Sequence, residues 1–119
     1  MVEEHRDELD RLNVLELTRK LGREPNVETA LHIMQWELGD LAKSYTYTKW
    51  HPDLAGAYKK EAEHALGSLL FQAQVVTELL GADSSDLFDF GRDTVIDRIV
   101  DKEKKLGRFE HYVGDKGSE

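Results

Sequence analysis

Apolar residues recur at intervals of three and four along most of the chain, which is the spacing typical of amphipathic α-helices. Strand patterns are nearly absent, since only the segment SYTYTKW, residues 44–50, combines β-branched and aromatic residues. The pattern predicts four helices, over residues 3–21, 26–45, 52–80 and 84–106. The expected fold is therefore all-α, with the four helices arranged as a bundle.

Glycine, proline and small polar residues mark the expected helix boundaries. Gly22 is expected to end the first helix, and Asn26 is expected to cap the second. Pro52 stands near the start of the third helix, and Ser84 or Ser85 near the start of the fourth. The first helix takes its apolar face from four leucines, Leu9, Leu12, Leu15 and Leu17.

Two glycines occupy similar places in the second and third predicted helices. Gly39 lies in WELGDL, residues 36–41, and Gly67 lies in HALGSL, residues 64–69. A glycine inside a helix costs about 1 kcal/mol relative to alanine, so a compensating gain is expected. Close packing of one helix on another is the simplest such gain. We therefore expect the two LG units to mark where the second and third helices cross.

Composition and charge narrow the classes of function. The chain has 119 residues, a formal net charge of −8 and no cysteine. An acidic surface repels the nucleic-acid backbone, so we expect no nucleic-acid polymer as a partner. A nucleotide would need bridging cations or a local basic patch. The charged N-terminus resembles no signal peptide and no run of about 18 apolar residues occurs, so we expect a cytoplasmic protein that does not enter a membrane.

The length predicts one domain spanning residues 1–119. Its core is expected over about 27–108, with an N-terminal helix in 1–22 and a frayed tail at 113–119. Helices this long with apolar residues on two sides need more cover than one small chain supplies. We therefore expect a homodimer or a homotetramer.

Two carboxylates in the second helix are the first candidate for chemistry. Glu37 and Asp40 are three residues apart, which places them on one helical face. Neighbouring carboxylates repel each other unless a proton or a cation lies between them. Mg²⁺ prefers oxygen ligands and often uses only one or two protein carboxylates. The pair is thus a candidate Mg²⁺ site, although the same spacing also occurs on solvated helix faces.

A second polar group lies on the third helix. Glu61 and His64 are three residues apart, and Ser68 and Gln72 continue the same stripe. The stripe can face the first carboxylate pair across the two helices, or it can be an exposed polar face. A single E-x-x-H motif does not make a di-iron bundle site, since such sites need two. Because histidine is a poor ligand for Mg²⁺, a site that includes His64 suits Mn²⁺ better.

A local basic stripe closes the fourth helix. Lys102, Lys105 and Arg108 recur every three residues within DKEKKLGRF. Cations near a helix C-terminus are favoured by the helix dipole, which is one explanation for the stripe. The other explanation is contact with phosphate groups.

These segments together resemble the MazG-like nucleotide pyrophosphohydrolases, the all-α NTP pyrophosphatase superfamily. WELGDLAK resembles the family's E-E-x-G-E-L-A-K segment, HALGSLLFQAQVV resembles its E-E-L-G-D-L-L helix, and DKEKKLGR resembles its closing K-x-x-K-N-x-x-R segment. The resemblance covers roughly residues 27–108. It implies a helical bundle that assembles as a dimer or tetramer and cleaves nucleoside triphosphates to monophosphate and pyrophosphate with Mg²⁺.

The resemblance assigns roles to individual residues. It implies Glu37 and Glu61 as catalytic residues, and the implied ligands of Mg²⁺ or Mn²⁺ are Glu37, Asp40, Glu61 and His64. The implied substrate contacts are Trp36, Lys102, Lys105 and Arg108. The chain departs from the family pattern at the second acidic motif, which falls on Ala65 and Ser68, and in the closing segment, where Leu106 replaces asparagine.

Three functions follow from these observations. The first is a metal-dependent pyrophosphohydrolase of a nucleoside triphosphate, which the resemblance favours. The second is a relative with the same fold that binds a nucleotide or a protein without turnover, which the incomplete second motif favours. The third is an unrelated helical oligomer with a structural role, for which an antiparallel bundle with a polar stripe would suffice.

Overall fold

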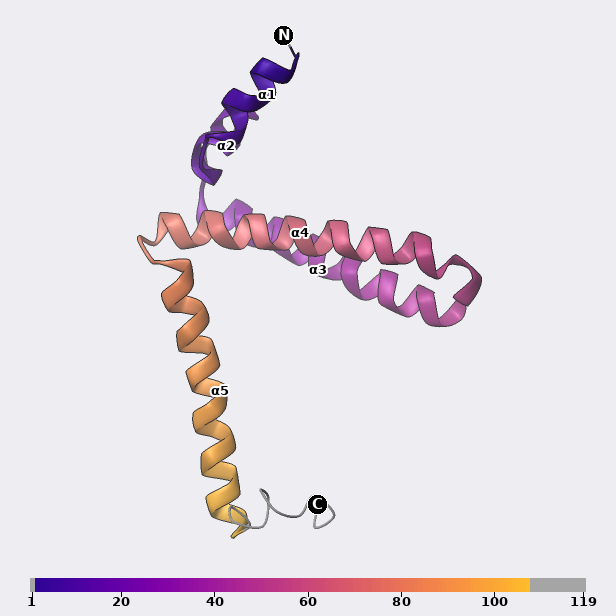
Figure 1. The fold of residues 1–119 in the computed structure, drawn as a ribbon, viewed down its shortest axis with the longest axis vertical. Coiled ribbons are helices and arrows are strands. Elements are labelled where there is room, and N and C mark those ends of the chain that lie inside the picture. Colours follow the sequence, from indigo (N-terminus) through magenta and orange to yellow (C-terminus); the bar gives the residue numbers. More distant parts are fainter. Residues whose placement is uncertain (1, 108–119) are drawn as a thin grey trace. The chain divides into compact units, whose positions relative to one another are not determined.

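The computed structural model describes residues 2–107, and within that range the chain is helical with no strand, which confirms the all-α prediction. The elements are α1 (Val2–Asp10), α2 (Val14–Lys20), α3 (Val27–Trp50), the short 3₁₀ helix η1 (Pro52–Leu54), α4 (Ala55–Leu79) and α5 (Ser84–Leu106). The chain divides into two compact units, one ending at Ala82 and the other beginning at Asp83. Figure 1 shows the helices of each unit.

The single N-terminal helix predicted over residues 3–21 is wrong, because the chain breaks after Asp10 into α1 and α2. Asn13 and Glu16 form a capping box at the start of α2: the Asn13 side chain accepts a hydrogen bond of 2.8 Å from the Glu16 N–H, and the Glu16 carboxylate accepts one of 2.9 Å from the Asn13 N–H. This reciprocal capping stabilises the start of a new helix at Asn13, although the leucine spacing favours one continuous helix. Gly22, with φ of 99°, follows α2 as expected.

The start of α3 confirms the predicted cap, but its end lies further along the chain. The Asn26 side chain accepts a 2.8 Å hydrogen bond from the Thr29 N–H. The helix then continues to Trp50 rather than ending at Tyr45. The reason lies in side-chain contacts of the last turns, where the Tyr47 ring lies 5.7 Å from the rings of both Trp50 and Tyr58. Packing between aromatic rings outweighs the strand preference of this segment.

The packed body of the first unit is an antiparallel hairpin of α3 and α4, which lie side by side (Figure 1). The buried positions of the hairpin are all small or medium-sized: Ala30, Ser44, Ala65, Val75 and Thr77. Thr77 satisfies its hydroxyl by donating to the Ala73 carbonyl at 2.8 Å. Small side chains at a helix contact allow the two backbones to approach closely, because little volume separates them.

The two LG units do not mark this crossing, so that expectation is wrong. A Cβ atom built on Gly39 or Gly67 meets no other side chain and no other helix within 4 Å among the described residues. Both glycines therefore lie on open faces of the hairpin. The residues that mark the crossing are instead Ser44 and Ala65, which are 3% and 2% exposed.

Helix α5 is the described part of the second unit, and it has the predicted bounds. Asp83 caps it by accepting a 3.1 Å hydrogen bond from the Asp86 N–H, Gly91 does not interrupt it, and Gly107 ends it with φ of 65°. Within residues 2–107, no single helix is both long and apolar enough to cross a membrane. The segments 52–79 and 84–106 pass that test only when they are taken together.

Replacing either open glycine by alanine is expected to stabilise the protein. Gly39→Ala and Gly67→Ala should each raise the free energy of unfolding by about 0.5–1 kcal/mol, because alanine favours the helix and nothing obstructs the new methyl group. Urea unfolding followed by circular dichroism measures the change. Gly22→Ala is the matched control and should lower stability, since its φ of 99° strains any side chain. A loss of stability at Gly39 or Gly67 would contradict the open-face assignment.

Candidate functional site

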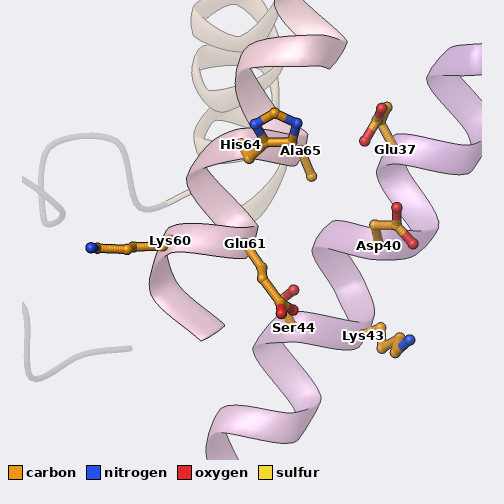
Figure 2. Close-up of a pocket in the computed structure, with 8 residues that line it drawn as sticks. All are labelled: Glu37, Asp40, Lys43, Ser44, Lys60, Glu61, His64 and Ala65. Carbon is orange, nitrogen blue, oxygen red and sulfur yellow. The ribbon is translucent and has the colours of Figure 1, made fainter. Parts of the chain in front are cut away.

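A pocket of about 410 Å³ lies along the α3–α4 hairpin. Eight residues line it: Glu37, Asp40, Lys43 and Ser44 from α3, and Lys60, Glu61, His64 and Ala65 from α4 (Figure 2). All four residues that were predicted as metal ligands are thus in the lining of one pocket. The antiparallel direction of the two helices brings the two ligand pairs together, although they are more than twenty positions apart in the sequence.

The α3 side of the pocket carries the first acidic pair. Glu37 is half-buried, Asp40 is exposed, and both point from the same side of α3 (Figure 2). The helical period explains this arrangement, because residues three apart lie on one face. The half-burial of Glu37 lowers the local dielectric and strengthens its interaction with any cation that enters.

The α4 side supplies Glu61 and His64, one turn before the positions of the second acidic motif. The Glu61 side chain extends from α4 toward α3, so that the carboxylates of both helices face the same space (Figure 2). His64 is exposed at the other end of the lining. A shift by one helical turn keeps the same face, so Glu61 can take part in the pocket, whereas Ser68, further along that face, does not line it.

Ala65, at one of the two positions where the resemblance expects an acid, is buried. Its side chain is 2% exposed and lies in the buried part of the lining with Ser44. A carboxylate at this position would leave water for the contact between the helices, where an unpaired charge is costly. The close approach of α3 and α4 is therefore incompatible with an acid at position 65.

The donor set suits a hard divalent cation but does not form a complete cage. Within residues 2–107, no three His, Asp or Glu side chains lie close enough together to hold one metal ion. The chemistry of the lining still fits Mg²⁺, because Glu37, Asp40 and Glu61 offer oxygen ligands in one pocket. Mg²⁺ commonly takes one or two carboxylates and completes its shell with water and substrate phosphates.

Two lysines in the lining were not predicted from the sequence. Lys43 follows Asp40 by three residues, so helical spacing was the available signal for it, whereas Lys60 is adjacent to Glu61 and has no such spacing. Figure 2 shows Lys60 pointing away from the three carboxylates. The Lys43 ammonium lies 5.6 Å from the centre of the Tyr47 ring, within the range of a cation–π contact. The pocket thus has negative charge between the helices, and its two lysines belong to the lining without pointing at the carboxylates.

The remaining predicted substrate contacts do not line the pocket. Trp36 is 70% exposed and absent from the lining, although it is adjacent to Glu37. Lys102 and Lys105 belong to the second unit, where Lys105 pairs with Asp101 at 3.1 Å. Arg108 lies outside the described residues, as does the predicted frayed tail at 113–119.

Compared with protein-family models, with curated proteins and with solved structures, the chain matches none of them. The resemblance to MazG-like enzymes therefore rests on the quoted segments alone. A function for the chain has to be inferred from the pocket and from the chemistry of its lining.

Replacing the buried Ala65 by an acid should destabilise the hairpin. Ala65→Glu is expected to lower the free energy of unfolding by about 2–4 kcal/mol, because the carboxylate is forced into the helix contact. His64→Glu, one residue away and exposed, serves as the control and should change stability by less than about 0.5 kcal/mol. Urea unfolding measures both. Equal stability of the two variants would show that the helices separate easily at this point.

Proposed function

We propose that the chain is a divalent-metal-dependent hydrolase that converts a nucleoside triphosphate to monophosphate and pyrophosphate, in the manner of the MazG-like enzymes. One observation carries the proposal: Glu37, Asp40, Glu61 and His64 line a single pocket. Two further cationic side chains, Lys43 and Lys60, lie in the same lining. Carboxylates for a metal and ammonium groups for phosphate oxygens are the parts that phosphoryl chemistry needs.

The acidic centre of the pocket favours a metal-dependent reaction. A triphosphate carries several negative charges and is repelled by three carboxylates unless a cation lies between them. In the proposal, Glu37 and Asp40 hold Mg²⁺ or Mn²⁺, with His64 favouring Mn²⁺. When bound, the ion supplies positive charge at the phosphate oxygens and makes a nearby water more acidic.

The side chains around that centre have separate tasks in the proposal. Glu61 extends toward α3, where it orients the attacking water and accepts its proton. Lys43 binds phosphate oxygens at the edge of the pocket and neutralises charge on the pyrophosphate that leaves, whereas Lys60, which points away from the carboxylates (Figure 2), has to rotate toward the pocket to do the same. Trp36, Lys102, Lys105 and Arg108 stay predicted contacts to the nucleotide.

A binding protein without turnover is the second candidate. The buried Ala65 and the lack of a three-residue ligand group among residues 2–107 favour it. In this alternative, the pocket binds a metal–nucleotide complex, or the hairpin binds a protein, and no bond is cleaved. The two candidates share the pocket and differ in whether Glu61 acts as a base.

A homo-oligomer forms part of the proposal, because α3 exposes large apolar side chains. Leu31, Leu38 and Tyr45 recur every seven residues and are 46%, 58% and 64% exposed. A repeat of seven places all three on one line along the helix. Pairing this line with the same line of a second hairpin would complete a four-helix bundle, as a dimer or within a tetramer.

Metal binding is the first test of the proposed site. Calorimetric titration of Mg²⁺ and then Mn²⁺ should show binding, and Glu37→Gln should weaken it by roughly tenfold or more, which is about 1.4 kcal/mol. Glu63→Gln is the matched control, because Glu63 is an exposed α4 acid that pairs with Lys59 at 3.6 Å and does not line the pocket. If neither ion binds, or if both variants bind alike, the metal site is wrong.

Turnover separates the two candidates. A panel of nucleoside triphosphates with Mg²⁺ or Mn²⁺ should yield pyrophosphate, and Glu61→Gln should lower the rate by roughly 100-fold or more, as removal of a general base does. Glu63→Gln should keep the rate. Metal-dependent nucleotide binding without pyrophosphate release would favour the binding protein over the hydrolase.

A further inference from the structure

Helix α5 carries an apolar line that no described residue of its own unit covers. It spans Ser84–Leu106 and has no buried residue. Phe88, Val95, Ile99 and Leu106 are 72%, 54%, 48% and 51% exposed. Because an α-helix turns by about 100° per residue, these four positions fall within about 40° of one another. We call these four residues the α5 seam.

The intervals between the residues of the α5 seam are the same when they are read from either end of the helix. Successive members are seven, four and seven residues apart. The seam is therefore symmetric about residue 97, and a second α5 placed antiparallel would meet it in register. Phe88 would then lie opposite Leu106 of the second copy, and Val95 opposite Ile99. With a rise of about 1.5 Å per residue, the shared seam would be about 27 Å long.

Charge along α5 favours the antiparallel direction. From residue 84 to 97 the helix has four acids, Asp86, Asp89, Asp93 and Asp97, and one base, Arg92. From residue 98 to 106 it has four bases, Arg98, Lys102, Lys104 and Lys105, and two acids, Asp101 and Glu103. Antiparallel pairing sets the acidic half of one helix beside the basic half of the other. Parallel pairing would set like charges side by side, which is unfavourable.

The positions between the apolar layers are polar. Arg92 and Lys102 lie on the seam side of the helix and would share a layer in the antiparallel register. Asp89 and Glu103 flank these cations and can neutralise them. A polar layer of this kind weakens a coiled coil but selects one register, because a slipped register would oppose a cation to an apolar residue.

We propose that α5 is a self-association helix, which pairs antiparallel with α5 of a second copy of this chain through the α5 seam. The exposed apolar line, its symmetric spacing and the opposite charges of the two halves all fit this occupant. The contact is separate from the α3–α4 pocket and does not depend on the function proposed for it.

Cysteine cross-linking tests the register, because the chain has no cysteine of its own. Phe88→Cys and Leu106→Cys are purified separately, one with a mass tag, and then mixed and oxidised. The mixture should give a disulfide-linked heterodimer as the main cross-linked species, while each variant alone should give little. Val95→Cys mixed with Ile99→Cys repeats the test at the centre. Asp97→Cys, on the far face of the helix, should not cross-link.

Three outcomes would overturn the proposal. Efficient self-linking of Phe88→Cys would show parallel pairing. Linking of Asp97→Cys comparable to that of the seam variants would show random collision. Absence of a mixed link in both pairs, with helix content retained by circular dichroism, would assign the seam to another part of this chain or to another protein.

Discussion

The close approach of α3 and α4 is the constraint on which the rest of the described structure depends. Its buried positions hold only Ala30, Ser44, Ala65, Val75 and Thr77, so the two helices approach closely there, whereas the larger rings of Tyr47 and Tyr58 meet near the turn that joins them. Because the helices run antiparallel, polar residues on either side of this contact face one another across a short gap. The pocket exists for that reason: its buried part is made by small residues, and its open part is made by the charged residues next to them.

The same constraint limits the chemistry of the pocket. Close contact at Ala65 excludes a carboxylate from that position, so the acids available to a cation come from Glu37 and Asp40 on one helix and from Glu61 on the other. Because no three of these side chains form a ligand group among residues 2–107, the proposed site can hold a cation only if water and phosphate supply the remaining ligands. The proposal therefore expects a metal to bind more tightly together with its phosphate ligand than alone. Close contact of the two helices requires a small residue at position 65, whereas a more complete set of protein ligands would require an acid there.

Local signals in the sequence predicted much of the fold, and contacts between helices account for what it did not predict. Asn26 and the bounds of α5 followed from capping and turn preferences, which depend on a few neighbouring residues. The break before α2 was not predicted, because the leucine spacing alone favours one continuous helix, although the N-x-x-E pattern of the capping box at Asn13 is visible in the sequence. The prediction that Gly39 marks the crossing of two helices was wrong for a different reason. Periodicity shows which residues share a face, but it does not show which face meets the partner helix. The acids of the pocket and Lys43 were predictable from spacing on each helix, whereas Lys60, which is adjacent to Glu61, has no such spacing.

The size of the buried residues has a consequence for assembly. Burial of apolar area stabilises a fold by about 25 cal/mol per Å², so alanine, serine, valine and threonine contribute little compared with leucine or phenylalanine. In this chain several large apolar residues, among them Leu38, Leu70 and Phe88, are more than half exposed instead. If copies associate as proposed, that surface becomes buried and adds stability, and folding then depends on protein concentration. The line of residues on α3 and the α5 seam lie in different units and are two separate contacts in the proposed assembly. Two independent contacts per chain are the minimum that a closed tetramer with dihedral symmetry needs, whereas a dimer needs only one.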